Sequence, residues 1–466
     1  MSEHGSGDNT QTRALASFIA GLRYEDIPRE VIERIKLLML DSIGCALYGA
    51  ELEWCRILRS SLESLDATRT TSVWGTKHRL SSPHAALLNG TQVQGFELDD
   101  VHRQGVLHVG AVTLPGLIAV AESHRNISGR DFLAAAVAGY ETGPRVGLCM
   151  GQEHIGQGWH SGATVGVFSA AAAAARGLGL DADKTVHALG IAGTQSAGLM
   201  AAQYGAMVKR MHAGRSAQSG LYGALLAKDG FTGIVDIFEA PYGGFCTTFS
   251  RSTDRFNLAK LSEGLGQRFE TMRVSLKFYS CVGSNHTTLD AIRDIRARLA
   301  FALDELSKIV VHGSRVTVDH VGWPYKPQGL TSAQLNLPFC VATLLLEGDV
   351  SVDQFKPEAV DDAARIALSR KVEVIEDPAI TAQGSNFRHK VRVDVHLADG
   401  SVHSETREAP RGSETSFASA DDIVDKFRKL SRGVLPAGQQ QKLIDAMLNL
   451  ETLADARELT ALLAVV

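Results

Sequence analysis

Apolar residues recur every three or four positions over residues 31–48, VIERIKLLMLDSIGCALY, which predicts a helix with one face in a core. The same spacing continues with few prolines from residue 12 to about residue 260. Ser128 and Asp131 precede another apolar run in the pattern of a capping box, which predicts the start of a second helix. The first half of the chain is therefore expected to be a helical domain.

Small residues crowd two of these helical segments, at 162–180 and 188–206. They let helix backbones approach closely, so we expect tight packing and an extensive subunit contact. The most apolar window, residues 163–175, is about thirteen residues long, which is shorter than the roughly 20 apolar residues of a membrane-spanning helix. It is expected to form a buried helix, and a membrane is not expected as a partner.

The period of the pattern changes between about residue 269 and residue 400. Apolar and polar residues alternate over Met272–Tyr279, which predicts a half-buried strand. Further strands are expected at 308–319, 371–375 and 390–397, with a hairpin at Asp399-Gly400 and helices at 287–303 and 332–347. The helical period returns from residue 420, so the tail is expected to pack on the first domain. The predicted fold class is mainly α, with a smaller α/β segment on an antiparallel or mixed sheet.

Composition and charge narrow the partners and the compartment. The chain has 44% hydrophobic residues, as a soluble globular protein does, and a net charge of -5 gives no general attraction for nucleic acid. Residues 1–11 are expected to be a disordered tail, because MSEHGSGDNT lacks the apolar stretch of a signal peptide. The six cysteines form no CxxC pair, for which a reducing cytoplasm is the simplest location.

The segment FELDDVHRQGVLH, residues 96–108, concentrates ionisable side chains. Histidine exchanges protons near neutral pH and a carboxylate can orient it, so Asp99 or Asp100 with His102 or His108 would form an acid–base pair. The alternative is a solvated acidic turn. The same groups with the histidine of GWHSG would also be competent metal ligands, although no HExxH motif is present.

Two further segments suit the binding of a carboxylate. His160 precedes the Gly/Ala-rich helix, where free backbone NH groups favour an anion, unless it only packs at the helix start. Lys209 and Arg210 follow a stretch of small and apolar residues, and His212 lies on the helical face of Lys209. Both cations suit carboxylate recognition, whereas an isolated Lys-Arg pair is more often solvated surface.

Three residues of the second segment could line a polar pocket. Lys277 and Tyr279 are expected on one face of the predicted strand, and Tyr325 is expected on a loop. The alternative for Lys277 is an exposed strand edge that the lysine protects from pairing. Phosphate-binding loops, GxGxxG turns and GxSxG elbows are missing, which argues against nucleotide chemistry and serine hydrolysis.

From about Ala14 to Leu430 the chain resembles the MmgE/PrpD family. The motifs that carry the resemblance, in order and spacing, are FELDDVH…LH, GWHSGATVG, GIAGTQSAGLMAAQYGAMVKRMHAG, LLAKDGFTG, PYGGF and KFYSCVGSNHTTLDAI. The family includes 2-methylcitrate dehydratases, cis-aconitate decarboxylases and iminodisuccinate epimerases, which act on small polycarboxylates without a redox or nucleotide cofactor. The chain looks closest to the branch of the decarboxylases and epimerases, because it has the ELDD-x-H-x5-H variant and the SAGLMAAQYG–MVKR run. Val101 and His108-Val-Gly replace the Thr and the HPG or HPS of many members, which argues against a substrate taken over from the dehydratases.

The resemblance implies an architecture and a site. It implies an all-helical domain from residues 12–265 and 405–466, an α+β lid domain from 266–404, and a homodimer. The implied pocket residues are Asp99, Asp100, His108, His160 and Lys209, which are expected to be catalytic, and Lys277, which is expected to bind substrate. From their places in the segments described above, His102, Arg210, Tyr279 and Tyr325 are also expected to bind substrate.

The leading hypothesis is a cofactor-independent lyase that transfers a proton beside a carboxylate of a small di- or tricarboxylate. Cations near the developing carbanion would stabilise it, and the histidines would exchange protons. Three alternatives stay open: an epimerase of an amino-dicarboxylate such as iminodisuccinate, a metal-dependent hydrolase or lyase, and a non-catalytic carboxylate-binding protein.

Overall fold

The computed structural model describes residues 10–151, 153–204, 206–384 and 387–465, and these form two compact units. The first unit holds the chain up to Gly95, Asp99–Ser275 and the chain from Ser419 onwards. The second holds Phe96–Leu98 and Leu276–Ala418. The predicted disordered tail lies outside the described residues up to position 9, but its last two residues start a helix.

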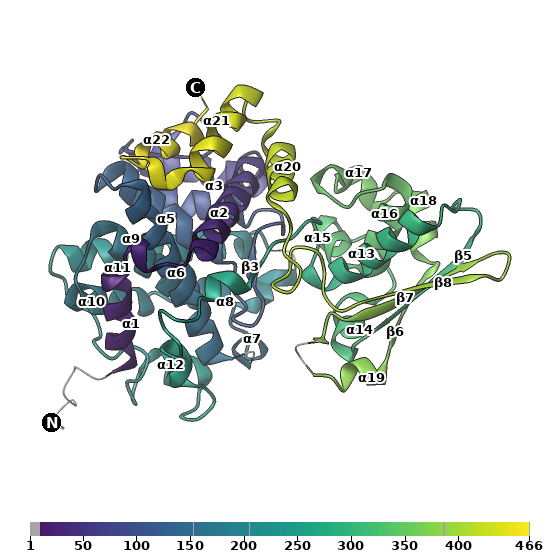
Figure 1. Ribbon diagram of the computed structural model, residues 1–466, viewed down its shortest axis with the longest axis horizontal. Helices are drawn as coiled ribbons and strands as arrows, with labels where there is room; N and C mark the ends of the chain where they lie inside the picture. Colours follow the sequence, from purple (N-terminus) through teal and green to yellow (C-terminus); the bar gives the residue numbers. More distant parts are fainter. Residues whose placement is uncertain (1–9, 152, 205, 385–386, 466) are drawn as a thin grey trace. The chain divides into compact units, whose positions relative to one another are not determined.

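The first unit is helical. Its helices are α1 (Gln11–Gly21), α2 (Arg29–Gly49), α3 (Glu53–Leu65), α4 (Ser82–Val93), α5 (Val109–Ser123), α6 (Gly129–Met150), α7 (Glu153–Gly156), α8 (Ser161–Thr164), α9 (Gly166–Leu178), α10 (Ala182–Gly193), α11 (Val208–Lys228), α12 (Phe245–Ser250), α20 (Ala420–Ser431), α21 (Ala437–Leu448) and α22 (Arg457–Thr460). Two short antiparallel ladders join β1 (Thr71–Ser72) to β2 (Arg79–Leu80) and β3 (Val101–His102) to β4 (Val274–Ser275). Figure 1 shows the C-terminal helices, in yellow, beside α2.

Several predicted helical features of this unit are confirmed. The helix predicted at 31–48 is α2, and the Ser128 side chain accepts a hydrogen bond from the Asp131 N–H at the start of α6. Close helix approach in the 162–180 segment is also confirmed, because a β-carbon added to Gly220 of α11 would lie 2.6 Å from the Val167 carbonyl oxygen of α9. The single helix predicted at 163–175 is wrong in one detail: the chain turns at Val165, between α8 and α9.

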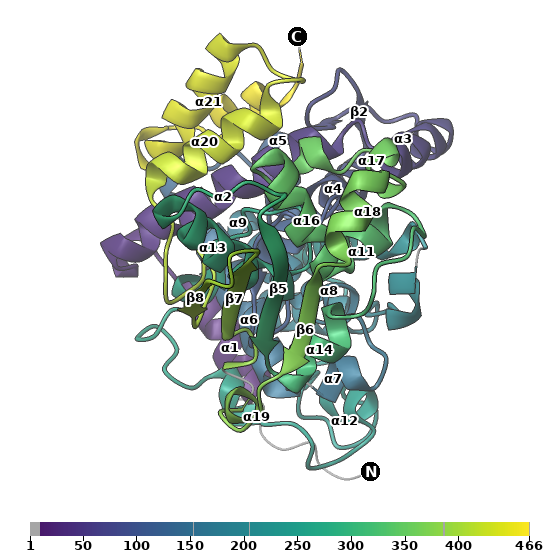
Figure 2. The same ribbon diagram turned by 90° about the vertical axis from the view of Figure 1, so that its right-hand side faces the viewer.

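The second unit combines a mixed sheet with helices. Its helices are α13 (Gly283–Arg298), α14 (Arg315–Val321), α15 (Leu330–Leu335), α16 (Leu337–Glu347), α17 (Pro357–Val360), α18 (Ala363–Ser369) and α19 (Pro378–Thr381). Its strands are β5 (Leu306–Gly313), β6 (Val372–Glu376), β7 (Val391–Leu397) and β8 (Val402–Arg407). The strand order is β6-β5-β7-β8, with β5 and β6 parallel and the other pairs antiparallel (Figure 2).

The strands predicted at 371–375 and 390–397 and the hairpin at Asp399-Gly400 are confirmed by β6, β7 and the β7–β8 turn. The strand predicted at 308–319 is half wrong, because Ser314 caps α14 by accepting a hydrogen bond from the Thr317 N–H. The strand predicted at Met272–Tyr279 is wrong except for β4, since the chain passes into the second unit at Leu276.

The predicted helix 332–347 is interrupted. Asn336 ends α15 and caps α16, because its side chain accepts a hydrogen bond from the Phe339 N–H. Pro338 in the first turn of α16 fits this restart, since proline is tolerated there. Within the described part of the chain, no helix has both the length and the apolar character needed to cross a membrane.

Candidate active site

Asp99 and His108 form a close pair in the first unit. Asp99 Oδ2 lies 2.8 Å from His108 Nδ1, and the Asp99 side chain is fully buried. His108 is the N-cap residue of α5, and 14% of its side chain is exposed. A carboxylate at Nδ1 holds the proton on that nitrogen and leaves Nε2 available for proton exchange. Asp99 or Asp100 with His102 or His108 were the expected acid–base pairs, and the structure places Asp99 and His108 in contact.

Asp100 has a different environment from its neighbour. Its Oδ1 accepts a hydrogen bond of 2.9 Å from the Gly110 N–H, and its Oδ2 accepts one of 2.9 Å from the Tyr140 hydroxyl. Burial and the nearby charge of Asp99 raise the pKa of Asp100 to about 7. Asp100 therefore links the first turn of α5 to α6. Because His108 is the N-cap residue of α5, this link also fixes the position of His108.

His102 has partners inside the protein at both ring nitrogens. Its Nδ1 accepts a hydrogen bond of 2.9 Å from the Gly105 N–H, so the proton resides on Nε2, which lies 3.1 Å from Glu270 Oε2. Burial acts to raise the pKa of Glu270, but its hydrogen bond with His102 and the charges of Arg273 and Arg145 lower it to about 2. This geometry favours a structural role over the substrate contact expected for His102.

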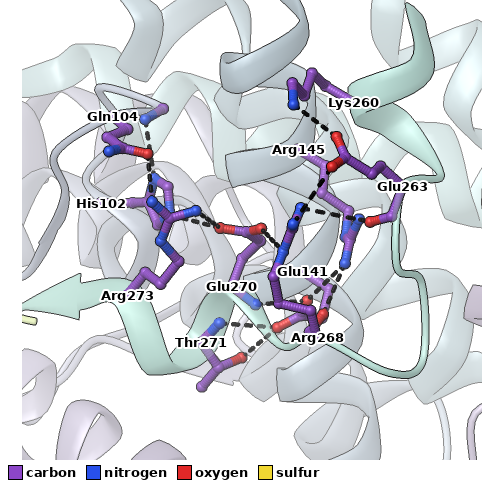
Figure 3. Close-up of polar contacts among 11 residues, drawn as sticks. His102, Gln104, Glu141, Arg145, Lys260, Glu263, Arg268, Glu270, Thr271 and Arg273 are labelled. Atoms are coloured by element: carbon purple, nitrogen blue, oxygen red, sulfur yellow. Dashed lines mark hydrogen bonds and ion pairs between the residues drawn. The ribbon is translucent and has the colours of Figure 1, made fainter.

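Glu270 belongs to a buried ionic network that the sequence did not reveal. Figure 3 shows its carboxylate between His102 and Arg273 on one side and Arg268 on the other. The adjoining carboxylate of Glu141, on α6, accepts hydrogen bonds from the backbone N–H groups of Glu270 and Thr271 (Figure 3). The network fastens residues 268–273 to the helical core.

His160 faces a second histidine. Its Nδ1 lies 3.1 Å from Nδ1 of His212 on α11, so one ring donates and the other accepts. Burial, with the charge of Lys209, lowers the pKa of His212, which keeps that ring neutral near pH 7. His160 is the N-cap residue of α8, a helix of only four residues, and the Gly/Ala-rich helix that was expected to begin directly after His160 starts at Gly166 as α9.

The two cations of α11, Lys209 and Arg210, have different neighbours. Lys209 is half-buried and close enough to His212 to influence its pKa. Arg210 is buried, with its guanidinium 5.8 Å from the centre of the Trp54 ring. Lys209 is therefore the cation that accompanies the histidine pair.

Gln94 is a site residue that sequence reasoning missed. It is fully buried, and neither side-chain amide atom has a hydrogen-bond partner among the residues that the structure describes. A β-carbon at Gly162 would lie 3.0 Å from His160 Cε1 and 4.0 Å from Gln94 Nε2, so the amide lies near His160. Buried amides normally are hydrogen-bonded, which makes Gln94 a candidate ligand group. Its position five residues before Asp99 was the available signal.

The second unit contains the remaining predicted residues. Lys277 Nζ lies 3.6 Å from Glu97 Oε2, and Glu97 has a left-handed backbone with φ of 57°, a strained conformation common at functional sites. The hydroxyl of Tyr279 donates to Asp290 Oδ1 over 2.6 Å. Tyr325 lies on a loop as predicted, and its hydroxyl donates to the Val360 carbonyl over 3.0 Å.

The acids, histidines and cysteines of the chain also bear on metal ligation and thiol chemistry. In the described ranges, no group of three or more His, Cys, Asp or Glu side chains is arranged to hold a metal ion. All six cysteines are buried and free, and the Sγ atoms of Cys149 and Cys246 lie 3.8 Å apart. The first unit thus holds two imidazole systems, Asp99–His108 and His160–His212, and Lys209 and the Gln94 amide accompany the second of them.

Known proteins resemble the chain along nearly its whole length. The model of the MmgE/PrpD N-terminal domain matches residues 13–257, and that of the MmgE/PrpD C-terminal domain matches residues 279–452. The chain is 37% identical to the cis-aconitate decarboxylase-like protein oryM of Aspergillus oryzae, over 97% of each chain. It is 32% identical to the cis-aconitate decarboxylase of Aspergillus terreus, covering 97% of this chain and 95% of that one. Identity to the 2-methylcitrate dehydratase of Salmonella typhimurium is 21%, over 92% of each chain.

Proposed function

Because this chain belongs to the MmgE/PrpD family, we propose that it is a lyase that decarboxylates cis-aconitate or a close tricarboxylate analogue. The observation that carries the proposal is the similarity to proteins named for cis-aconitate decarboxylation, which spans 97% of this chain at 37% and 32% identity. The buried Asp99–His108 pair provides a group suited to the required proton transfer.

Decarboxylation requires two steps, cleavage of a carbon–carbon bond and protonation of the resulting anion. The bond between carbon and the departing carboxylate breaks, and its electron pair stays on the substrate as an enolate-like anion. A proton must then form a new C–H bond. His108, held at Nδ1 by Asp99, is proposed to deliver that proton from Nε2, with His160 as the second proton-exchanging group.

Charge stabilisation is assigned to Lys209. A cation beside the developing anion lowers the barrier when water is excluded, and Lys209 is half-buried next to the His160–His212 pair. Lys277 is proposed to bind substrate on the basis of the family resemblance, and Arg210, Tyr279 and Tyr325 on the basis of their places in the sequence.

Three finer features also belong to this proposal. The second unit would act as the lid of the family architecture, catalysis would need no redox or nucleotide cofactor, and the chain would form a homodimer in the cytoplasm. Light scattering of the purified protein tests the dimer, and elemental analysis without chelator tests the metal-dependent alternative.

A dehydratase is the second candidate, supported by the more distant similarity to 2-methylcitrate dehydratases. Proton NMR in deuterated water, with cis-aconitate, 2-methylcitrate and iminodisuccinate offered separately, distinguishes the reactions. Vinyl signals with release of carbon dioxide support the decarboxylase. Conversion of 2-methylcitrate without carbon dioxide supports the dehydratase, and deuterium exchange without net conversion supports an epimerase. No change with any substrate contradicts the proposal.

A further inference from the structure

A buried ion pair joins the C-terminal tail to the N-terminal part of the first unit. Lys426 Nζ of α20 lies 2.5 Å from Asp41 Oδ1 of α2, and the exposed fractions of the two side chains are 6% and 0%. The helices pack closely here, since a β-carbon at Gly44 would lie 3.3 Å from the Phe427 α-carbon. Figure 2 shows α20 running beside α2.

Burial of such a pair is an expensive way to join two helices. Removing both charges from water costs several kcal/mol per ion, and apolar side chains of similar volume often serve stability as well or better. The apolar core around the pair, which includes Ile43, Phe427 and Leu430, shows that such packing is available. Packing of the two helices alone therefore does not explain why Asp41 and Lys426 are charged residues.

The pair lies close to the groups that support His108, because a β-carbon at Gly110 of α5 would lie 2.0 Å from Oγ of Ser42, the residue after Asp41, and the Gly110 N–H donates to Asp100 over 2.9 Å. The titratable or charged groups gathered here come from α2, the 99–100 segment, the start of α5, α6 and α20, and they are Arg34, Asp41, Cys45, Asp99, Asp100, His108, Tyr140 and Lys426. Lys426 and Arg34 are the cations of this set, against the three carboxylates of Asp41, Asp99 and Asp100.

The charges of Asp99 and Lys426 influence each other. Burial opposes the charged form of Lys426, but the carboxylates of Asp41 and Asp99 outweigh it and raise the pKa of the lysine. Burial raises the pKa of Asp41, the charge of Asp99 adds to this, and Lys426 acts against it. Lys426 is thus a cation at neutral pH, within electrostatic reach of the carboxylate that holds His108.

We infer that Lys426, held by Asp41, is a positioning residue whose ammonium group balances the carboxylate of Asp99 and so maintains the ionised partner of His108. The inference rests on the proposed function of His108 in proton transfer. Lys426 acts through Asp99 and is not assigned a contact with substrate. The C-terminal tail would then complete the acid–base site electrostatically as well as by packing.

The inference predicts shifts of opposite sign for the two halves of the pair. Removing a cation raises the pKa of every group near it, because the protonated form is always the more positive one. In Lys426→Met, the limb of the kcat/KM profile that His108 controls should move to higher pH by about one unit, whether His108 acts as acid or as base. In Asp41→Asn, the same limb should move to lower pH. The double variant Asp41→Asn/Lys426→Met should fall between the two.

The experiment is a pH profile of kcat and KM for these variants, with the substrate identified by NMR. Arg428→Met is the matched control, because Arg428 is a half-exposed cation on the same helix and should leave the profile unchanged. Lys426→Arg should retain the parent profile. If one single variant fails to fold, the other single variant still tests the sign of its own shift, and the double variant, in which no unpaired charge is left behind, shows whether removal of the second charge reverses that shift.

Superimposed profiles for folded Lys426→Met, Asp41→Asn and parent proteins would overturn the inference and assign the pair to packing alone. Shifts of the same sign in both single variants would also overturn it. Full activity of His108→Asn would instead overturn the proposed function, so the two failures are distinguishable.

Discussion

Oδ2 of Asp99 lies 2.8 Å from Nδ1 of His108, whereas the carboxylate of the next residue, Asp100, is directed to Gly110 and Tyr140. Two adjacent acids of one motif thus have separate tasks. Asp99 contacts the imidazole of His108, for which proton transfer is proposed, and Asp100 anchors the helix that His108 caps.

The two acids should therefore respond differently to the same substitution. In Asp100→Asn the amide oxygen can accept from the Gly110 N–H and the NH2 group can donate to the Tyr140 hydroxyl, so activity should stay within about tenfold of the parent. In Asp99→Asn the carboxylate that orients His108 is lost, and kcat should fall by about 10² or more. Steady-state kinetics of both variants checks this, and equal losses would contradict the separate roles.

Lys209 should affect binding and rate, unlike another lysine of the same helix. Lys209→Met removes the cation next to the histidine pair, and kcat/KM should fall by about 10²-fold or more, because a charged contact to carboxylate is lost. Lys228→Met at the exposed end of α11 is the matched control and should behave as the parent. A parent-like kcat/KM for Lys209→Met would remove Lys209 from the site.

The Glu270 network predicts a loss of stability in acid. The folded-state pKa of Glu270, about 2, is below its ordinary value of 4.5, so its stabilisation is fully present above about pH 4.5 and is lost as the pH falls towards 2. The difference in unfolding free energy between the parent and Glu270→Gln should therefore shrink from pH 7 to pH 3. Urea unfolding at several pH values measures it, and a constant difference would contradict the role of His102 as the partner.

The close helix contacts predict opposite effects for two glycines. In Gly214→Ala the new methyl group would lie 1.9 Å from the Leu87 carbonyl oxygen, and the helices must separate, at a cost of about 1–3 kcal/mol. In Gly116→Ala the nearest atom, the Ala217 carbonyl oxygen, is 3.4 Å away, an ordinary contact, so the helix preference of alanine should add up to about 1 kcal/mol. Denaturant unfolding of both variants checks the two signs.

Local elements of the fold followed well from the sequence where periodicity and caps agree. Helix α2, the Ser128 cap and the β7–β8 hairpin are examples, because their signals are contained within a few residues. The alternation in Met272–Tyr279 misled because β4 pairs over only two residues before the chain enters the second unit. The length over which two strands pair is set by tertiary contacts, which a local pattern does not show.

In the candidate site, too, features within one short segment could be predicted from the sequence, whereas contacts between distant segments could not. The 96–108 segment could be recognised because its acids and histidines are dense in sequence, and its pairing of Asp99 with His108 required the structure. Asp41 and Lys426 are separated by nearly the whole chain, and each resembles an ordinary polar residue of an amphipathic helix. Only the packing of α20 on α2 reveals them as a pair.

The central claim, a decarboxylase that depends on the Asp99–His108 pair, is tested most directly by proton NMR of cis-aconitate with parent and His108→Asn proteins. Circular dichroism of both proteins serves as the control for folding. The account predicts vinyl product signals and carbon dioxide with the parent, and a rate lower by about 10²-fold or more with folded His108→Asn. Unchanged cis-aconitate with the parent, or full turnover by His108→Asn, would contradict it.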